Sequence, residues 1–374
     1  MKINLCILQG AFLPVPPCFG GAVEKRWFIL AQELVNLGCN VTHISKMIDG
    51  YPTEEHINGV RHVRVKGFDT PSNSIVLKMM DFFYSRRAVK MIPRDIDVVV
   101  TNSFFSPILL PTRLRSKVYV DVARMPKGQM KLYNTAAKLR GNSTPVAEAI
   151  KNELPLVDHD RVTMVPNPLP FVPSESSPPY SEKSGLLYCG RIHPEKGIEL
   201  CIDALRLIES PPELRIVGPW RTDQGGGGEV FYQKLKRKAE GLPVTFIDPI
   251  FSIEDLNLEY KRAAGFVYPS LAEKGETFGL APLEAMAWGC VPIVSDLACF
   301  KDFIKNGSNG LIFNHRTERA DIELADAIGR LLSSPELSEI MSQQALNVRV
   351  SHSVNAIAKR FLEDFKKICK PMNK

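Results

Sequence analysis

The sequence predicts an α/β protein with two doubly wound parallel sheets, and three observations support this fold class. The chain opens with an apolar run, KINLCILQG, followed by a helical pattern and a second apolar run, which is the order of a parallel strand–helix–strand unit. The same order restarts with GLLYCGRIHPEKGIELCIDALRLI. Between the two repeats, residues 168–184 are rich in proline and serine, a composition that excludes a helix or a central strand and indicates a linker.

The length supports the same division, because 374 residues exceed one ordinary hydrophobic core and suit two domains. We predict a first domain at residues 1–170 and a second at residues 171–353. A ligand of such sheets lies outside the carboxyl ends of the strands, which in the first repeat places it over Gly20 and Gly21. This glycine pair is not part of a G-x-G-x-x-G pattern, which counts against a dinucleotide-dependent oxidoreductase.

The composition is that of an ordinary globular protein. Its apolar runs stay short of the ~18 residues that a membrane span needs, and Met1–Leu8 leads straight into a strand rather than a signal peptide. We therefore expect a cytoplasmic protein, or one that is peripheral at a membrane. Eight cysteines are scattered without a C-x-x-C pair, which favours reduced core thiols over zinc sites or disulfides.

The net charge of +6 is unevenly distributed. Residues 1–170 hold 22 Lys and Arg against 14 Asp and Glu, giving +8, whereas residues 171–374 hold 25 against 27, giving −2. A basic first half suits an acidic or membrane-borne partner such as a lipid diphosphate, although it also serves solubility. We expect no nucleic-acid partner.

The segment SIVLKMMDFFYSRRAVKMI predicts a helix with two contrasting sides. One side is apolar and aromatic and the other is basic; their residues are Met79, Met80, Phe82 and Phe83, and Lys78, Arg86, Arg87 and Lys90. Two interpretations stay open. The helix either meets a membrane surface or a lipid acceptor, or it packs on the core with its cations in solvent.

The most informative stretch runs from Tyr268 to Gly289, YPSLAEKGETFGLAPLEAMAWG. It reads as the end of a buried strand, a polar loop, and a helix that begins at about Leu280 and stops at Gly289. Pro282 falls in the first turn of that helix, where proline is tolerated because the first N–H groups have no partner within the helix.

Anion-binding groups and carboxylates alternate in this stretch. The backbone N–H groups of Phe278, Gly279 and Leu280 lie at the expected helix N-terminus, which favours an anion such as a diphosphate. Glu276 and Glu284 lie on either side and suit sugar hydroxyls better than phosphate. The pattern predicts a site for a sugar attached to a nucleoside diphosphate; the plainer alternative is a surface helix with two solvated glutamates.

A second group of cations follows the first strand of the second repeat. Arg191 and Lys196 flank the loop after Gly190, and Gly197 opens a helix. Two cations directed at a helix N-terminus are suited to a departing diphosphate, although a pair of surface cations beside a turn is the alternative. No cluster of metal ligands accompanies them, so we expect neither a metal nor a cofactor.

Three segments resemble one family. EKGETFGLAPLEAMAWGCVPIVSD is similar to the E-x7-E region of the retaining GT-B glycosyltransferases of family four, the group 1 glycosyltransferases. GRIHPEKG resembles their G-R-x-x-x-x-K-G element, and FGGAVEK resembles their N-terminal glycine pair. The resemblance implies a GT-B fold, with two Rossmann-like domains facing across a cleft, an acceptor domain at 1–170 joined by a C-terminal helix at 354–374, and a nucleotide-sugar domain at 171–353.

The resemblance also implies an activity. It is the transfer of a hexosyl unit, with retention and without a metal, from a nucleoside diphosphate sugar to a hydroxyl of a sugar, glycan or lipid-linked acceptor. Arg191 and Lys196 would neutralise the pyrophosphate, Glu276 would meet the sugar and Glu284 the ribose. The remaining implied donor contacts are Gly20, Gly21, Gly190, Ile250, Phe278, Gly279 and Leu280. We expect UDP to be the nucleoside diphosphate of the donor because it is the most frequent one, and GDP to be the next candidate.

One position departs from the family pattern. Where the related enzymes usually have a histidine close to the reacting sugar, this chain has Asp121, in VYVDVARM. The aspartate either orients an acceptor hydroxyl or acts as a base, or it is a structural residue at a strand end. Two other functions stay open: a GT-B-shaped sugar-nucleotide epimerase, and a non-catalytic protein that binds nucleotide sugars.

Overall fold

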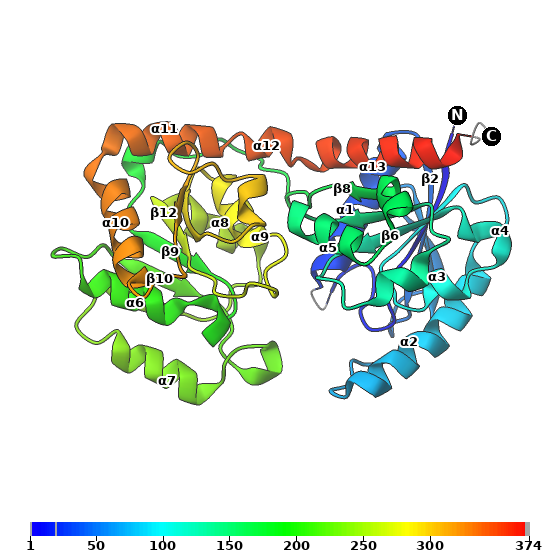
Figure 1. Ribbon diagram of the computed structural model, residues 1–374, viewed down its shortest axis with the longest axis horizontal. Helices are drawn as coiled ribbons and strands as arrows, with labels where there is room; N and C mark the ends of the chain where they lie inside the picture. The colour runs from blue at the N-terminus through cyan, green and yellow to red at the C-terminus, as the bar shows by residue number, and fades with distance from the viewer. Residues whose placement is uncertain (1, 19–20, 371–374) are drawn as a thin grey trace. The chain divides into compact units, whose positions relative to one another are not determined.

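The computed structural model describes residues 2–18 and 21–370, and it divides into two compact units. Unit 1 comprises Met1–Pro170 and His352–Lys374, and unit 2 comprises Phe171–Ser351. Each unit is a parallel sheet with helices packed against it (Figure 1). The predicted α/β class with two parallel sheets is therefore confirmed.

Within the described residues, the sheet of unit 1 has eight strands in the order β3-β4-β2-β1-β5-β6-β7-β8. All neighbours are parallel apart from the β3–β4 pair, which is antiparallel. The bounds are β1 (Asn4–Leu8), β2 (Asn40–Lys46), β3 (Glu54–Ile57), β4 (Val60–Val65), β5 (Val98–Thr101), β6 (Val118–Val122), β7 (Lys138–Gly141) and β8 (Val162–Met164). Its helices are α1 (Ala22–Asn36), α2 (Ser74–Ala88), α3 (Ser106–Leu109), α4 (Thr112–Arg115), α5 (Thr144–Asn152) and α13 (Val354–Cys369).

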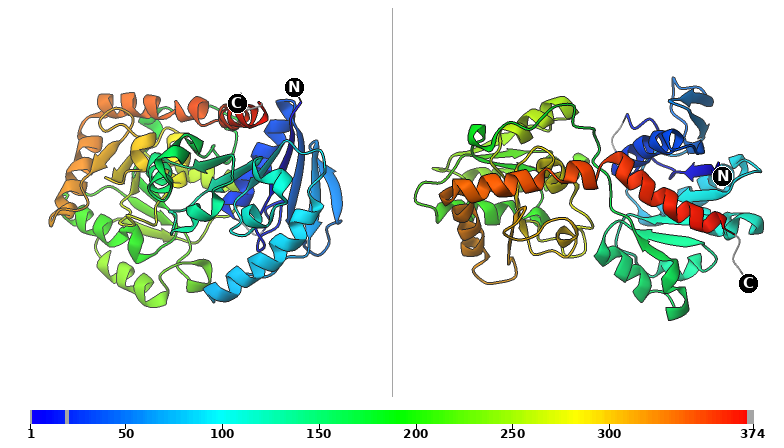
Figure 2. Two further views of the ribbon diagram at one scale, coloured as in Figure 1. Left: turned by 45° about the vertical axis from the view of Figure 1, so that its right-hand side comes forward. Right: turned by 90° about the horizontal axis from the view of Figure 1, so that it is seen from above.

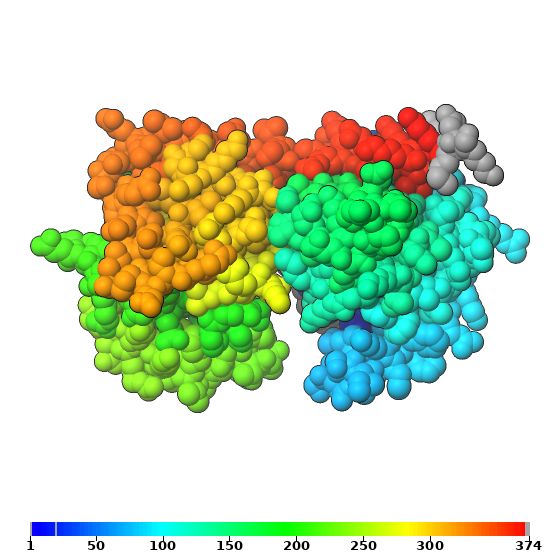
Figure 3. Space-filling view, in the orientation of Figure 1, coloured from blue at the N-terminus to red at the C-terminus, as the bar shows by residue number. Residues whose placement is uncertain are grey.

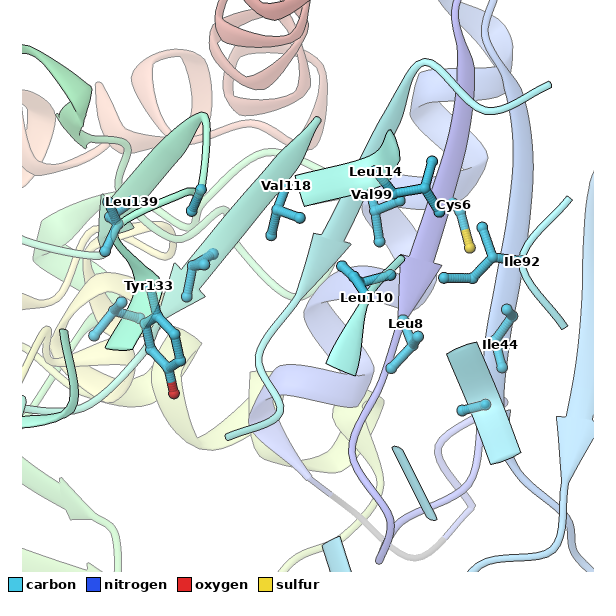
Figure 4. Packing of buried hydrophobic residues seen from close by; sticks show 14 of the residues in the cluster. Cys6, Leu8, Ile44, Ile92, Val99, Leu110, Leu114, Val118, Tyr133 and Leu139 are labelled. Atoms are coloured by element: carbon cyan, nitrogen blue, oxygen red, sulfur yellow. The ribbon is translucent and has the colours of Figure 1, made fainter. Parts of the chain in front are cut away.

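Alternate residues of the unit 1 strands enter two different cores, as the two-residue period of a strand requires. Leu5 and Ile7 face the core formed with α1 and α13, two helices that lie side by side (Figure 2). In this core the rings of Trp27 and Phe361 lie 5.0 Å apart. Cys6 and Leu8 face the opposite core, which includes residues of α2 and α5 (Figure 4). Because both faces are covered, the central strands β1 and β5 are nearly continuous apolar runs.

The sheet of unit 2 has six parallel strands, in the order β11-β10-β9-β12-β13-β14 among the residues described. They are β9 (Leu186–Cys189), β10 (Leu214–Val217), β11 (Val244–Ile247), β12 (Gly265–Tyr268), β13 (Val291–Ser295) and β14 (Leu311–Phe313). The helices are α6 (Ile198–Arg206), α7 (Glu229–Lys238), α8 (Ile253–Arg262), α9 (Leu280–Met286), α10 (Ala320–Ser333), α11 (Pro335–Ala345) and α12 (Val348–Ser351).

The strand order of unit 2 determines where a ligand can bind. The chain starts at β9, builds outward to β11, and then returns to add β12 on the other side of β9. The loops after β9 and β12 therefore diverge at the carboxyl edge, and open α/β sheets bind ligands in this crevice. No helix in the described ranges combines the length and the apolar character needed to cross a bilayer.

Candidate functional site

The two loops at the switch point of unit 2 touch each other. Gly197, between the loop after β9 and α6, has a φ of +68°, and a Cβ added there would lie 1.9 Å from the carbonyl oxygen of Pro269, just after β12. Glycine is therefore required at this close approach. The same packing brings Lys196, from the first loop, beside the loop that carries Glu276.

Lys196 and Glu276 form the central ion pair of the site. The Nζ of Lys196 lies 2.7 Å from Oε2 of Glu276, and their side chains are only 9% and 12% exposed. Lys196 Nζ also lies 5.3 Å from the centroid of the Tyr268 ring, at the end of β12. The structure thus joins two residues that the sequence analysis placed in separate anion-binding elements, and it balances the charge of the carboxylate with that of the lysine.

Two buried tyrosines form a rigid floor under this pair. The rings of Tyr188 and Tyr268 are stacked, with centroids 5.7 Å apart and planes at 10°. Burial and the charge of Glu276 raise the pKa of Tyr268 well above its ordinary value, so its hydroxyl stays protonated and donates to Glu276. The hydroxyl of Tyr188 donates to the carbonyl oxygen of Arg191 at 2.8 Å. Each tyrosine therefore positions one of the candidate donor-binding loops.

Arg191 is held on the rim rather than in the centre. Its guanidinium donates to the carbonyl oxygen of Gly225 at 2.8 Å and to Oε1 of Glu195 at 2.7 Å, and its side chain is 45% exposed. Arg191 therefore belongs to the same loop as Lys196 but does not contact the Lys196–Glu276 pair in the described contacts. A ligand phosphate would have to replace or share these two acceptors.

The glycine run at residues 225–228 forms a hydrogen-bonded turn. The N–H of Gly227 donates to the carbonyl oxygen of Ile192 at 2.8 Å, and the N–H of Gly228 donates to that of Trp220 at 2.8 Å. A Cβ on Gly226 would lie 2.2 Å from the carbonyl carbon of Trp220. The run is a close-packed turn against the Arg191 loop, and at Gly226 the backbone of Trp220 occupies the space of a side chain.

Glu284 lies on α9 and is directed at a different group of residues. Its Oε2 accepts a hydrogen bond from the hydroxyl of Tyr260 at 3.1 Å. Burial, and then the charge of Glu284, raise the pKa of the Cys189 thiol to about 12, which places this carboxylate near the end of β9. Glu276 and Glu284 are thus held by separate tyrosines, and each carboxylate is oriented independently of the other.

The residues expected to form a phosphate cradle have a packing role in the structure. Gly279 has a φ of +92°, and a Cβ there would lie 2.4 Å from Cε1 of Phe300, so an aromatic ring occupies the space that we expected to admit a phosphate. Phe278 is buried, with its ring centroid 5.4 Å from that of Phe303. The helix that begins at Leu280 ends at Met286, short of the predicted Gly289. A seven-residue helix has a smaller dipole than we assumed, so the cations become the main source of positive potential.

Gly190 and Ile250 lie after two strands of unit 2, β9 and β11, at the same edge of the sheet. A Cβ on Gly218, after β10, would lie 1.9 Å from the carbonyl oxygen of Gly190, so the loops after β9 and β10 are in contact. Ile250 is half-buried in the loop between β11 and α8. Both predicted donor contacts therefore lie at the carboxyl edge of the sheet, with Ile250 two strands away from Gly190.

In unit 1, the predicted glycine pair is only partly described. Gly20 lies outside the described residues, and Gly21, with a φ of +89°, precedes α1. The group nearest to Gly21 is the carboxylate of Glu24, because a Cβ on Gly21 would lie 2.3 Å from its Oε2. Burial raises the pKa of Glu24. Sequence reasoning missed this residue, although a glutamate at the third helical position is a known capping signal.

Asp121 does not fit the expected role at an acceptor. Its side chain is fully buried at the end of β6, and it accepts hydrogen bonds from Arg26, from Arg140 Nη1 at 2.7 Å and from Trp27 Nε1 at 2.8 Å. Burial alone would raise its pKa, but the charges of Arg26 and Arg140 hold the pKa below its ordinary value. An enclosed, permanently ionised carboxylate can neither reach an acceptor hydroxyl nor take its proton, so the structural alternative is the one that this geometry supports.

The partners of Asp121 extend the buried network. Asn167 Oδ1 accepts hydrogen bonds from Arg26 at 2.7 Å and from Arg140 at 2.9 Å, and Arg140 Nε donates to the carbonyl oxygen of Val165 at 2.6 Å. Sequence reasoning missed these residues. No local signal connects them, because they come from α1, β7 and the segment after β8.

Comparison with known proteins finds similarity to one family of enzymes. Residues 174–348 match the family model described as glycosyl transferases group 1. A GDP-mannose-dependent alpha-(1-6)-phosphatidylinositol dimannoside mannosyltransferase of Mycobacterium tuberculosis is 31% identical, over 40% of this chain and 36% of its own length. A lipopolysaccharide 1,2-N-acetylglucosaminetransferase of Salmonella typhimurium is 29% identical, over 48% of each chain. The chain thus spans between about a third and a half of these curated relatives.

Solved structures resemble the whole chain at low sequence identity. Sucrose-phosphate synthase from Thermosynechococcus elongatus has a TM-score of 0.73 at 19% identity, and the match covers 98% of this chain and 99% of that one. Anabaena HepE in complex with UDP has a TM-score of 0.68 at 15% identity, with 98% and 100% covered. At this identity the likeness concerns the fold alone, and the fold is GT-B, as the sequence analysis predicted.

Proposed function

We propose that the chain, whose residues 174–348 match the model of the group 1 glycosyltransferases, transfers a hexosyl unit from a nucleoside diphosphate sugar to a hydroxyl acceptor. The observation that carries the proposal is the half-enclosed Lys196–Glu276 pair at the switch point of unit 2. A diphosphate needs a fixed cation, and a sugar needs a fixed hydrogen-bond acceptor. Here one ion pair supplies both groups, with Nζ of Lys196 2.7 Å from Oε2 of Glu276.

The ion pair also resolves an electrostatic difficulty. A bare carboxylate beside a diphosphate would repel it, and Lys196 cancels most of that repulsion while it keeps two further N–H groups for a phosphate oxygen. Glu276 accepts from Lys196 and from Tyr268, which uses about half of the acceptor capacity of a carboxylate. The remaining capacity is available for a sugar hydroxyl.

In the proposed reaction, the bond between the anomeric carbon and the diphosphate oxygen breaks as the acceptor oxygen bonds to the same carbon. Lys196 and Arg191 stabilise the negative charge that develops on the departing diphosphate; groups of this kind contribute ~3 to 4 kcal/mol each. Family likeness suggests attack on the face that the diphosphate leaves, with retention, and transfer of the acceptor proton to a departing phosphate oxygen. Glu284, fixed by Tyr260, would hold the ribose.

The proposals for the donor and the acceptor rest on the relatives rather than on contacts in the structure. Relatives include a GDP-mannose-dependent mannosyltransferase, and a solved neighbour was crystallised with UDP-glucose. We propose UDP first and GDP next as the carrier, no metal or cofactor, and a sugar, glycan or lipid-linked acceptor in glycan, polysaccharide or glycolipid synthesis. None of the relatives named above is an epimerase or a non-catalytic binding protein, so neither alternative is proposed further.

The first test is a thermal-shift panel with UDP, GDP, ADP, dTDP and NAD, followed by the sugar derivatives of any ligand that stabilises the protein. A ligand at ~100 times its dissociation constant adds ~2.7 kcal/mol, which moves the unfolding midpoint by a few degrees. We expect one nucleoside diphosphate to stabilise the wild type and Lys274→Ala, a change at an exposed lysine of the loop that carries Glu276, but not Lys196→Ala. Stabilisation by NAD alone, or equal stabilisation of all three proteins, would refute the donor site.

A further inference from the structure

Hydrogen bonds of its buried polar residues hold the helix α2 against the rest of unit 1. The carboxylate of Asp81 accepts hydrogen bonds from the Ser103 hydroxyl at 3.1 Å and from the Phe105 N–H at 3.1 Å. The Ser85 hydroxyl lies 2.9 Å from that of Ser103, and both are buried. These hydrogen bonds fix the rotation of the helix about its axis, so the identity of its outward residues is determined by the fold.

The outward residues of α2 are apolar. Ile75, Met79 and Phe83 are spaced by four residues, which places them along one side of the helix, and they are 72%, 56% and 49% exposed. The usual pattern is therefore inverted in part, since Asp81 and Ser85 face the protein together with Tyr84 and Ala88, while three large apolar groups face solvent. Contiguous exposed apolar groups of this size mark a surface that contacts something else. This part of the chain is light blue in Figure 3.

The same surface is basic. Lys78, Arg86 and Lys90 are exposed beside the apolar row, and Asp81, the one acid of α2, is buried beneath it. We call the set of Ile75, Met79 and Phe83 with Lys78, Arg86 and Lys90 the α2 surface. Its charge complements an anionic partner, and its apolar row requires that the partner also offers a hydrocarbon phase.

A pocket adjoins the α2 surface and contains a cation without an acceptor. Its volume is about 360 Å³, and it is lined by Phe68, Phe83, Arg86, Arg87 and Lys90. The Arg87 guanidinium lies 5.0 Å from the Phe68 ring centroid, and its Nε and Nη2 atoms are buried with no hydrogen-bond partner among the described residues. Donors that have lost water without gaining an acceptor are costly, and a phosphate oxygen would satisfy them.

We propose that the α2 surface binds an anionic phospholipid bilayer, with a lipid phosphate in the Arg87 pocket and the apolar row in the acyl boundary. A bilayer presents phosphate and hydrocarbon within a few ångströms of each other, which matches a helix that carries both kinds of partner along one side. A free phosphate would satisfy Arg87 but would leave Ile75, Met79 and Phe83 in water.

The first test measures co-sedimentation of the full chain with vesicles of phosphatidylcholine alone and of phosphatidylcholine mixed with phosphatidylglycerol. We expect binding to the anionic vesicles only. Arg86→Gln/Lys90→Gln should lower their partition coefficient about 30-fold, which corresponds to ~1 kcal/mol for each cation. The matched control is Lys236→Gln/Arg237→Gln, which removes two exposed cations from α7 in unit 2 and should leave binding unchanged. Equal losses in the two variants would overturn the proposal.

The second test separates a bilayer from a soluble phosphate. Met79→Ser/Phe83→Ser keeps all the cations and should weaken vesicle binding at least ~10-fold, whereas Val230→Ser/Leu258→Ser, at exposed positions of unit 2, should not. Thermal midpoints close to that of the wild type show that the variants are folded. If inorganic phosphate stabilised the protein but the protein did not co-sediment with anionic vesicles, the pocket would be a site for soluble phosphate. The bilayer proposal would then be wrong.

Discussion

Two carboxylates held by ion pairs, Asp121 near the end of a strand in unit 1 and Glu276 in a loop of unit 2, show how the surroundings of a carboxylate decide its role. Asp121 in unit 1 is enclosed by two arginines and a tryptophan, and its side chain has no exposed surface. Glu276 in unit 2 is held by one lysine and one tyrosine and keeps 12% of its side chain exposed. The first carboxylate is saturated and can only stabilise the protein. The second is oriented but unsaturated, which is the state that a binding group needs.

The two units should also differ in how their stability depends on pH, because unit 1 contains buried histidines with lowered pKa values. We expect this to be the largest effect. Three buried histidines lie in unit 1: burial holds the pKa of His43 well below its ordinary value, and burial followed by neighbouring arginines lowers the pKa values of His62 and His352 to about 4. In the unfolded chain these groups titrate near 6.5. Their contribution is therefore complete above pH 6.5 and is lost as the pH falls towards 4.

The loss approaches ~1.4 kcal/mol per pH unit for each histidine, because the unfolded state then binds more protons than the native state. Thermal unfolding at pH 7.5, 6 and 5, followed by limited proteolysis, should show unit 1 melting earlier as the pH falls while the midpoint of unit 2 changes less. His62→Asn should reduce the pH dependence. If the unfolding midpoints of both units fell equally with pH, the buried histidines of unit 1 would not be the cause of the pH dependence.

Asp121→Asn should destabilise unit 1 by ~3 to 5 kcal/mol, because it leaves Arg26 and Arg140 buried without a counter-charge. Glu276→Gln, at the less enclosed carboxylate, should cost much less stability but should impair transfer. Urea unfolding monitored by circular dichroism measures the first effect, and donor turnover measures the second. If Asp121→Asn unfolded like the wild type and lost only activity, Asp121 would regain the acceptor role that its burial argues against.

Lys196→Ala should lower turnover by ~10²- to 10³-fold while the protein stays folded, because it removes a cation that is fixed where the diphosphate departs. It also leaves Glu276 as an uncompensated negative charge at the same place. The double variant Lys196→Ala/Glu276→Gln should therefore lose less than the sum of the two single losses. Additive losses would mean that the two residues act at separate points of the site.

Sequence reasoning succeeded where a local pattern and a topological rule acted together. Lys196 and Glu276 each follow a recognisable strand, and strands of one parallel sheet bring such loops to one edge. It failed where the outcome depended on pairing between distant elements. The network of Asp121, Arg26 and Arg140 is of this kind. Likewise, only the folded chain shows that Phe300 lies against Gly279.

The smallest effect concerns the glycine turn that holds Arg191. In Gly226→Ala the new methyl group would meet the backbone of Trp220 at 2.2 Å, which should displace the turn and with it Gly225, the acceptor of the Arg191 guanidinium. We expect kcat to fall about 10-fold, or ~1.4 kcal/mol, with a smaller change in the KM of the donor, because Arg191 acts mainly on the departing charge. Gly329→Ala is the matched control, since a methyl group there meets nothing within 4 Å. Adding Gly226→Ala to Arg191→Ala should then change kcat little; a further 10-fold loss would mean that the turn acts through something other than Arg191.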